Sequence, residues 1–248
     1  MPLSVTRALC ALACSLLLFH SAATADEPAK MQLPPPPDPE LCTRVTKEFV
    51  KAGGIQAMQF AGIHSIQTPT DNWMMQQIMS EVRPDFVIET GTLNGATTLF
   101  YATVLGQVRP TARVFTVDIK KQWEAAATYP AWKDRVEFFL GSSTAPEVVK
   151  QITERVKKVK NAKVLVTLDS LHTKEHVAKE LEFYAPLVTK DSYLVVQDTT
   201  YDTMLDAKDG PLAAVKEFLA KHPEFETDRS RERFLITFYP GGYLKRVR

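Results

Sequence analysis

The sequence predicts a doubly wound α/β domain with a mostly parallel sheet. Two observations predict this fold: short apolar, β-branched runs recur along the chain, and amphipathic segments with helical spacing lie between most of them. Strands that are apolar along their whole length are typical of parallel sheets covered by helices on both faces. No repeat of 20 to 50 residues, as in a solenoid or a propeller, is visible.

The expected strands are short and rich in Val, Ile, Leu and Phe. They are residues 85–90, 113–119, 135–140, 163–169, 192–198 and 233–239. The expected helices have apolar residues at spacings of three and four. They are residues 145–158, 173–188 and 211–221. Met74, Met75 and Met79 also have helical spacing and predict a helix that packs on the sheet before the first of these strands.

The N-terminal 25 residues have the features of an export signal. An apolar stretch, residues 8–19, follows Arg7, and Ala23 to Ala25 form a small-x-small cleavage pattern. This stretch is shorter than the roughly 20 apolar residues that span a bilayer. We therefore expect cleavage after Ala25 and a periplasmic or secreted protein. An uncleaved anchor is the alternative, and the protein is cytoplasmic if the signal interpretation is wrong.

Residues 26–39 predict a linker between the signal and the domain. The segment is polar and aperiodic, and Pro34 to Pro37 favour an extended polyproline conformation. The folded domain is therefore expected over residues 40–248. Cys42 would be alone in the mature chain, so no internal disulfide can form and stability must come from the core.

Charge argues against a nucleic-acid partner. Lys and Arg total 30 against 29 acidic residues, so no basic excess is available to neutralise phosphates. A membrane partner is expected only if the N-terminal segment stays uncleaved. The oligomeric state is left open, a homo-oligomer included.

Polar or small residues follow nearly every predicted strand. In order along the chain they are Glu89 with Gly91, Asp118, Gly141 with Ser142, Asp169, and Gln197 with Asp198. Taken one at a time, each fits a helix cap or a turn. As a series they indicate a ligand site, because open α/β sheets bind ligands beyond the carboxyl ends of their strands.

The first strand is followed by the turn GTLNG, framed by Gly91 and Gly95. It lacks the GxGxxG spacing that brings a backbone close to a pyrophosphate, so it suits S-adenosylmethionine better than NAD or FAD. Asp118 is expected to bind the ribose hydroxyls, with a helix N-cap as the alternative. Glu89 is a candidate for the amino group of the methionine part, and Asn94 is a further candidate cofactor contact.

A second group of residues suits a divalent cation. Asp169 and His172 follow one predicted strand, and Gln197 and Asp198 end the next. Two carboxylates and an amide oxygen are ligands that Mg²⁺ accepts, and such an ion could acidify a hydroxyl group. The alternative is that both acids cap the helices that follow. His172 is a candidate proton acceptor, although a lone His is more often structural, and HTKEH is not the HExxH zinc pattern.

Several stretches resemble the cephalosporin hydroxylase/rhamnosyl O-methyltransferase family. They include QTPTDNWMMQQIMSEVRPDFVIETGTLNGATTLFYA, FFLGSSTAPEVV, VLVTLDSLHTKEHVAKELEFYAPLV, SYLVVQDT and DRSRERFLITFYPGGYLKR, and together they run from about residue 56 to the C-terminus. The resemblance implies a Rossmann-like fold of the class I methyltransferase type, S-adenosylmethionine as cofactor and a Mg²⁺-type site. By position it implies cofactor contacts at Glu89, Gly91 and Asp118, Ser142 near the adenine, and metal ligands at Asp169 and Asp198.

The chain departs from this family at position 197. The family typically has Glu before the second Asp, whereas this chain has Gln197, and the loss of one charge should weaken Mg²⁺ binding. The leading hypothesis is an S-adenosylmethionine-dependent O-methyltransferase, assisted by a divalent cation and acting on a hydroxyl of a small molecule, sugar or glycolipid. The alternative is an exported, non-catalytic binding module with the same fold; a hydroxylase ranks last.

Overall fold

The computed structural model describes residues 34–204 and 209–248. The predicted signal peptide and most of the predicted linker lie outside the described residues. The first helix begins at Pro39, where the side chain of Asp38 accepts a hydrogen bond from the backbone N–H of Glu40. A proline in the first turn and an acidic N-cap are both favourable at a helix start.

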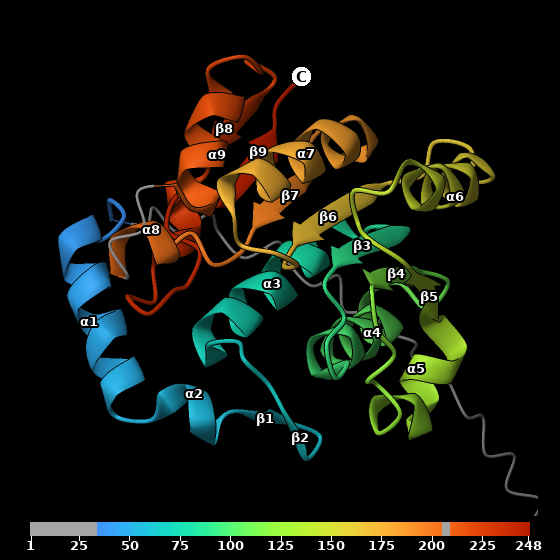
Figure 1. The fold of residues 1–248 in the computed structure, drawn as a ribbon, viewed down its shortest axis with the longest axis horizontal. Helices are drawn as coiled ribbons and strands as arrows, with labels where there is room; N and C mark the ends of the chain where they lie inside the picture. Colours follow the sequence, from blue (N-terminus) through green and yellow to red (C-terminus); the bar gives the residue numbers. More distant parts are fainter. Residues whose placement is uncertain (1–33, 205–208) are drawn as a thin grey trace, which may run out of the picture. The chain divides into compact units, whose positions relative to one another are not determined.

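The helices and strands alternate as expected (Figure 1). The α-helices are α1 (Pro39–Lys51), α2 (Gly54–Ala57), α3 (Pro69–Val82), α4 (Ala96–Val108), α5 (Pro130–Arg135), α6 (Pro146–Lys157), α7 (Lys174–Tyr184), α8 (Tyr201–Met204) and α9 (Pro211–Leu219). The strands are β1 (Gln59–Phe60), β2 (Ile63–His64), β3 (Phe86–Thr90), β4 (Arg113–Asp118), β5 (Val136–Leu140), β6 (Val164–Leu168), β7 (Tyr193–Val196), β8 (Phe225–Thr227) and β9 (Tyr243–Arg246). Short 3-10 helices are η1 (Ala126–Thr128), η2 (Ala185–Leu187) and η3 (Arg229–Glu232).

The main sheet has the order β5-β4-β3-β6-β7-β9-β8. Strands β3 to β7 pair in parallel, and only β9 runs antiparallel to its neighbours β7 and β8. The chain moves outward from β3 through β4 to β5, then crosses to β6 on the other side of β3. The strand order therefore reverses between β3 and β6, which is where doubly wound folds form their ligand crevice.

Two apolar clusters cover the two faces of this sheet. Helices α6, α7 and α9 pack on one face, and their buried side chains include Ile152, Leu181 and Phe218. Helices α3 and α4 pack on the other face, where Met75 and Met79 are fully buried against the strands. The methionine helix predicted from the sequence is thus confirmed, and so is the doubly wound arrangement.

The last predicted strand is wrong. Residues 233–239 form no strand; the chain passes through an irregular segment between η3 and β9. The backbone N–H of Phe238 donates to the buried Asp71 carboxylate at 2.8 Å, and that of Thr237 donates to the Thr46 hydroxyl at 3.2 Å. These side chains on α3 and α1 take the place of a strand ladder, and the sheet is completed by β8 and β9, which the sequence pattern missed.

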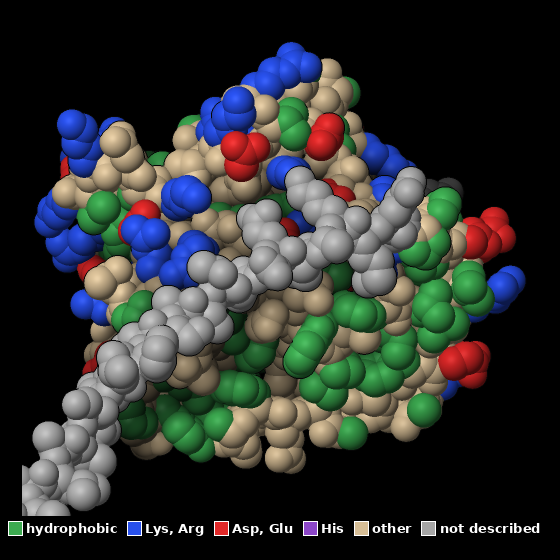
Figure 2. Space-filling view, turned by 180° about the vertical axis from the view of Figure 1, so that it is seen from behind, with side chains coloured by type: hydrophobic (Ala, Val, Ile, Leu, Met, Phe, Trp, Pro, Cys, Tyr) green, Lys and Arg blue, Asp and Glu red, His purple; other side chains and the backbone are tan. Residues whose placement is uncertain are grey.

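Side chains are unevenly distributed over the surface. On the face seen in Figure 2, Lys and Arg side chains gather toward one side and apolar side chains toward the other. Among the described residues, no helix is both long and apolar enough to cross a membrane.

Candidate active site

A cavity of about 610 Å³ lies at the carboxyl ends of the parallel strands. This volume is within the range of about 300 to 1,000 Å³ that is usual for small-molecule sites. Predicted site residues that line it are Gly91, Asp118, Ser142, Asp169, His172 and Asp198. Three others, Glu89, Asn94 and Gln197, are not part of the lining.

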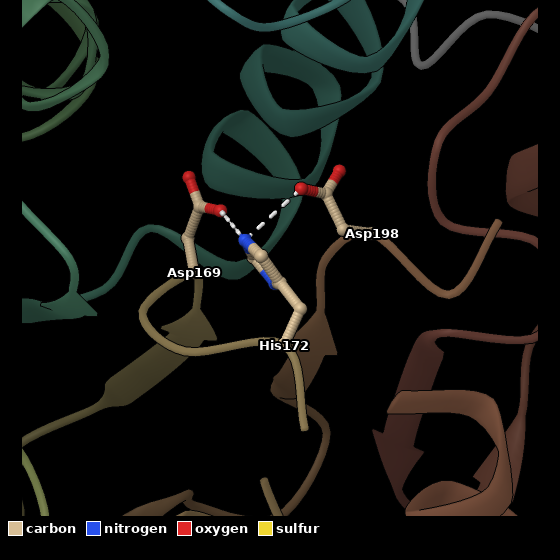
Figure 3. A group of neighbouring side chains, drawn as sticks. All are labelled: Asp169, His172 and Asp198. Carbon is tan, nitrogen blue, oxygen red and sulfur yellow. Dashed lines mark ion pairs between the residues drawn. The ribbon is translucent and has the colours of Figure 1, made fainter. Parts of the chain in front are cut away.

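Asp169, His172 and Asp198 form a compact group in this cavity (Figure 3). One ligand atom from each side chain lies within 4.8 Å of the others. The His172 Nε2 atom is 3.2 Å from Asp198 Oδ2 and 3.9 Å from Asp169 Oδ1. Since β6 and β7 are parallel neighbours, the residues that follow them meet at one edge of the sheet, as the sequence predicts.

The negative charges of the Asp169 and Asp198 carboxylates are poorly compensated by the described residues around them. Burial raises the pKa of Asp169 well above its ordinary value, and the nearby charge of Asp198 raises it further. Burial likewise raises the pKa of Asp198 to about 7. Desolvation lowers the pKa of His172, so the imidazole is mostly neutral near pH 7 and adds little positive charge. Two desolvated carboxyls with no counter-charge other than His172 among the described residues fit a divalent cation, because such an ion favours their ionised forms.

The side chain of Gln197 is 1% exposed and its amide is engaged on both sides. Its Oε1 accepts from Gln67 Nε2 at 2.6 Å and from the Tyr239 hydroxyl at 2.7 Å. Its Nε2 donates to Thr167 at 2.6 Å and to Tyr101 at 3.3 Å. The structure therefore places Gln197 outside the cavity lining, in a polar network that Gln67 links to Asp169, and its role as a metal ligand stays a prediction.

Gln67 is a site residue that the sequence pattern did not reveal. It lies 102 positions before Asp169, in the loop that precedes α3, and lines the cavity. Its Nε2 donates to Asp169 Oδ2 at 3.0 Å as well as to Gln197. Gln67 therefore orients one carboxylate of the candidate metal site. No local pattern around IQTPT signals this role.

Restoring a carboxylate at position 197 is expected to strengthen cation binding. All four partners of the Gln197 amide can act as donors, so Gln197→Glu keeps its hydrogen bonds while adding one negative charge beside the site. We expect Mg²⁺ to bind about 10-fold more tightly in calorimetric titrations. Gln151→Glu, the same change on an exposed part of α6, is the matched control. Equal Mg²⁺ affinity in the two variants would contradict this expectation.

Asp118 stabilises the first turn of the cavity. Its Oδ2 accepts from the backbone N–H groups of Thr92 at 3.0 Å and Leu93 at 2.9 Å. Its Oδ1 accepts from the backbone N–H of Lys120 at 3.1 Å. Asp118 is thus not a helix N-cap, the alternative raised by the sequence. It holds the β3–α4 turn from the neighbouring strand while lining the cavity, and ribose binding stays a prediction.

Glu89 is buried outside the lining of the cavity. As the fourth residue of β3 it points to the same face as Val87, toward α4. Thr98 of α4 and Thr116 of the neighbouring strand β4 donate to its Oε2. The side chain is fully buried, and its Oε1 has no hydrogen-bond partner in the described part of the chain. Burial raises the pKa of Glu89 to about 7. The predicted contact of Glu89 with a ligand amino group stays untested.

The raised pKa of Glu89 makes the free energy of unfolding decrease as the pH rises. A carboxyl whose folded pKa is raised from 4.5 to about 7 favours the folded state fully below pH 4.5, and this contribution is lost as the pH rises through 7. We expect Glu89→Gln to lack this loss. The unfolding free energy of the variant minus that of the wild type should therefore increase by about 2 kcal/mol between pH 5 and pH 8. Urea unfolding at both pH values measures the difference; parallel pH profiles would contradict it.

Asn94 connects two loops. Its Nδ2 donates to the carbonyl oxygen of His64 at 2.8 Å, and its Oδ1 accepts from the backbone N–H of Ala96 at 3.2 Å. The aromatic segment after β4 also has a structural role. Trp132 is buried with its ring centroid 5.2 Å from that of Trp123, and neither ring is part of the cavity lining. Both rings therefore contribute to packing of this segment.

Comparison with known proteins places this site in a family. The family model described as rhamnosyl O-methyltransferase/CmcI matches residues 53–247. Rhamnosyl O-methyltransferase of Mycobacterium leprae is 33% identical over 191 residues, which cover 75% of this chain and 81% of that protein. The protein of the same name from Mycobacterium tuberculosis strain H37Rv is 31% identical over 192 residues, 75% of this chain and 77% of its own length.

Solved structures confirm the fold. A CmcI structure described as containing Mg and SAM matches with a TM-score of 0.60 at 14% identity and covers 77% of each chain. An O-methyltransferase from Bacillus cereus in complex with SAH matches with a TM-score of 0.51 at 16% identity and covers 77% of this chain and 83% of its own. The predicted class I methyltransferase fold is therefore confirmed. The extent of the family match and the identities to the mycobacterial enzymes show that this chain belongs to the rhamnosyl O-methyltransferase/CmcI family.

Proposed function

We propose that this protein transfers a methyl group from S-adenosylmethionine to a hydroxyl group of a sugar, assisted by a divalent cation such as Mg²⁺. The transferase class follows from the family, whose model covers residues 53–247. The observation that carries the proposal is the group of Asp169, His172 and Asp198 inside the cavity at the switch point of the sheet. The names of the curated relatives support a rhamnosyl acceptor.

The residues of the cavity fit both S-adenosylmethionine and a divalent cation. The cavity has the volume of a small-molecule site, and Asp118 lines it at the end of β4, where ribose-binding carboxylates lie in related folds. Asp169 and Asp198 would hold the cation, and Gln67 keeps the Asp169 carboxylate turned toward it. A bound divalent cation supplies positive charge that lowers the pKa of a coordinated hydroxyl.

Catalysis in this proposal is mostly positioning. The acceptor oxygen must approach the methyl carbon in line with the bond to sulfur, so the residues that orient the acceptor set the rate. His172 is neutral near pH 7 because burial lowers its pKa, and it can therefore accept the proton of the hydroxyl group. The Tyr201 ring stacks on His172 with centroids 5.1 Å apart and planes 19° apart, which holds the imidazole in place.

A transfer assay tests the proposal. The purified full chain is incubated with S-adenosylmethionine carrying a labelled methyl group, methyl α-L-rhamnoside and Mg²⁺, and the labelled sugar is measured. We expect methylated rhamnoside with Mg²⁺ and a much smaller yield with EDTA. Calorimetric titration with S-adenosylmethionine is the companion measurement. Absence of binding with and without Mg²⁺ would overturn the proposal, and binding without transfer to any sugar would favour the non-catalytic alternative.

We further propose that the protein is exported, as its N-terminal sequence predicts. Residues 8–19 and the pattern at Ala23 to Ala25 support this location. N-terminal sequencing of the mature protein from fractionated cells tests it, with Asp26 expected as the first residue. An intact Met1 in the cytoplasmic fraction would contradict export.

A further inference from the structure

Residues 237–240, the irregular stretch that precedes β9, are fixed in the core by a buried carboxylate. Asp71 of α3 is 1% exposed, and its two oxygens accept from the Thr237 hydroxyl at 2.6 Å and from the Phe238 backbone N–H at 2.8 Å. The Thr237 hydroxyl in turn accepts from the backbone N–H of Tyr239 at 2.9 Å. Breaking any of these bonds would leave a buried polar atom unpaired, which is costly. The position of Tyr239 is therefore fixed relative to α3.

The Tyr239 hydroxyl reaches Asp169 through one amide. Tyr239 is 1% exposed, and its hydroxyl donates to Gln67 Oε1. The Nε2 of the same amide donates to Asp169 Oδ2 at 3.0 Å. Gln197 Oε1 also lies within hydrogen-bond distance of the hydroxyl, but it receives an N–H of Gln67 at 2.6 Å as well. Gln67 Oε1 is therefore the acceptor that depends on the phenol proton.

The orientation of the Gln67 amide matters because an ionised Asp169 carboxylate can only accept hydrogen bonds. A rotated amide would bring its oxygen against the carboxylate, where two acceptors would face each other without a proton. The terminal torsion of a glutamine is broad, so the orientation of its amide depends on the partners at both ends. Tyr239 supplies the partner at the oxygen end. Its hydroxyl therefore determines which end of the amide faces Asp169.

The same segment holds the loop that carries Asp198. The carbonyl oxygen of Phe238 accepts from the backbone N–H of Thr200 at 3.1 Å. This contact fixes the turn after Asp198, whose φ of 55° is in the left-handed region. A residue other than glycine keeps such a conformation when the surrounding structure holds it there. Asp169 and Asp198 are thus both held from residues 238–239, the first through a side-chain amide and the second through the backbone.

We propose that Tyr239 is a positioning residue of the cation site: through Gln67 it aligns the Asp169 carboxylate with that of Asp198, and it thereby favours Mg²⁺ over the larger Ca²⁺. The inference rests on the proposed function, which assigns a divalent cation to these two carboxylates. Mg²⁺ requires nearly ideal octahedral geometry with short metal–oxygen distances, whereas Ca²⁺ accepts flexible arrangements. Loosening one carboxylate should therefore weaken Mg²⁺ binding more than Ca²⁺ binding.

Titration with two cations tests the proposal. MgCl₂ and CaCl₂ are titrated calorimetrically and separately into the metal-free full chain and into Tyr239→Phe, which removes one hydroxyl group and keeps the ring. We expect Tyr239→Phe to bind Mg²⁺ about 10-fold more weakly and Ca²⁺ less than about 3-fold more weakly. Gln67→Met, which removes the amide, should lower Mg²⁺ affinity by a similar factor. The double variant should lose no more than either single variant, because both changes interrupt one path.

Tyr243→Phe is the matched control. Tyr243 is also fully buried and close in the chain, but its hydroxyl donates to Asp71 Oδ1 at 2.9 Å. This variant should be less stable than the wild type and keep the same ratio of Mg²⁺ to Ca²⁺ affinity. A structural role of Tyr239 alone would likewise leave that ratio unchanged.

If Tyr239→Phe does not fold, the two titrations of Gln67→Met decide the matter, because the proposed path passes through this amide. An unchanged ratio of Mg²⁺ to Ca²⁺ affinity in the variant that is measured, or additive losses in the double variant, overturns this inference and leaves the proposed function intact. Absence of Mg²⁺ binding by the wild type overturns the cation site of the proposed function and this inference together.

Discussion

Replacing Asp169 and Asp198 together by Asn is expected to weaken Mg²⁺ binding by about 100-fold or more and to abolish methyl transfer. The change removes both carboxylates of the candidate metal site but keeps their shape. Asn also tolerates the left-handed conformation of Asp198, which has φ 55°, so the fold should be retained. Calorimetric titration with Mg²⁺ and the rhamnoside assay measure the two effects.

The same variant is expected to unfold at a higher temperature than the wild type when EDTA is present. Both carboxyls have raised pKa values, so each favours the folded state at low pH, and the contribution of Asp198 is lost as the pH rises through about 7. Two neutral amides avoid that loss at pH 8. Asp191→Asn is the control, because Asp191 is exposed and precedes the N-terminal end of β7. It should alter neither the Mg²⁺ affinity nor the unfolding temperature. Wild-type Mg²⁺ affinity in the double variant would contradict the assignment of this site.

Gly91→Ala is expected to destabilise the fold by about 4 kcal/mol or more, enough to prevent accumulation of soluble protein. Gly91 has φ 86°, and a Cβ atom there would lie 1.8 Å from the carbonyl oxygen of Asp169. The glycine is required because the end of β3 lies directly against the backbone that follows β6. The requirement for glycine at this position therefore arises from a contact within the protein and not from a ligand. Urea unfolding of the variant, or its recovery in the soluble fraction, measures the effect.

Gly62→Ala separates this contact from ordinary backbone strain. Gly62 also has a positive φ, 76°, but an added Cβ would meet nothing within 4 Å. We expect it to cost only about 1 kcal/mol, the usual strain of a left-handed alanine. Similar losses in the two variants would show that the contact between the ends of β3 and β6 relaxes without cost.

Five of the main strands could be predicted because each reads as an apolar run. Strands β3, β4, β6 and β7 are buried along most of their length, and β5 at the sheet edge is only partly buried. The exceptions are at the C-terminus. Strands β8 and β9 are short and lie at the antiparallel edge, and β9 has Lys and Arg among its residues. The apolar segment 233–239 instead packs against α1 and α3 through Thr46 and Asp71, which lie more than 160 positions earlier in the chain. Local periodicity carries no information about such partners.

The sequence by itself determined the doubly wound fold, the family and the edge of the sheet at which Asp118, Asp169 and Asp198 meet. It did so because parallel strands must be apolar along their length and their carboxyl ends lie at one edge. Only the tertiary structure decided which polar residues enter the cavity. Glu89 belongs to the strand interior and points under α4, the Gln197 amide is held by four distant partners, and Gln67 reaches Asp169 across 102 positions. The side-chain direction at a strand end and contacts between remote loops depend on packing, which one chain's local pattern does not record.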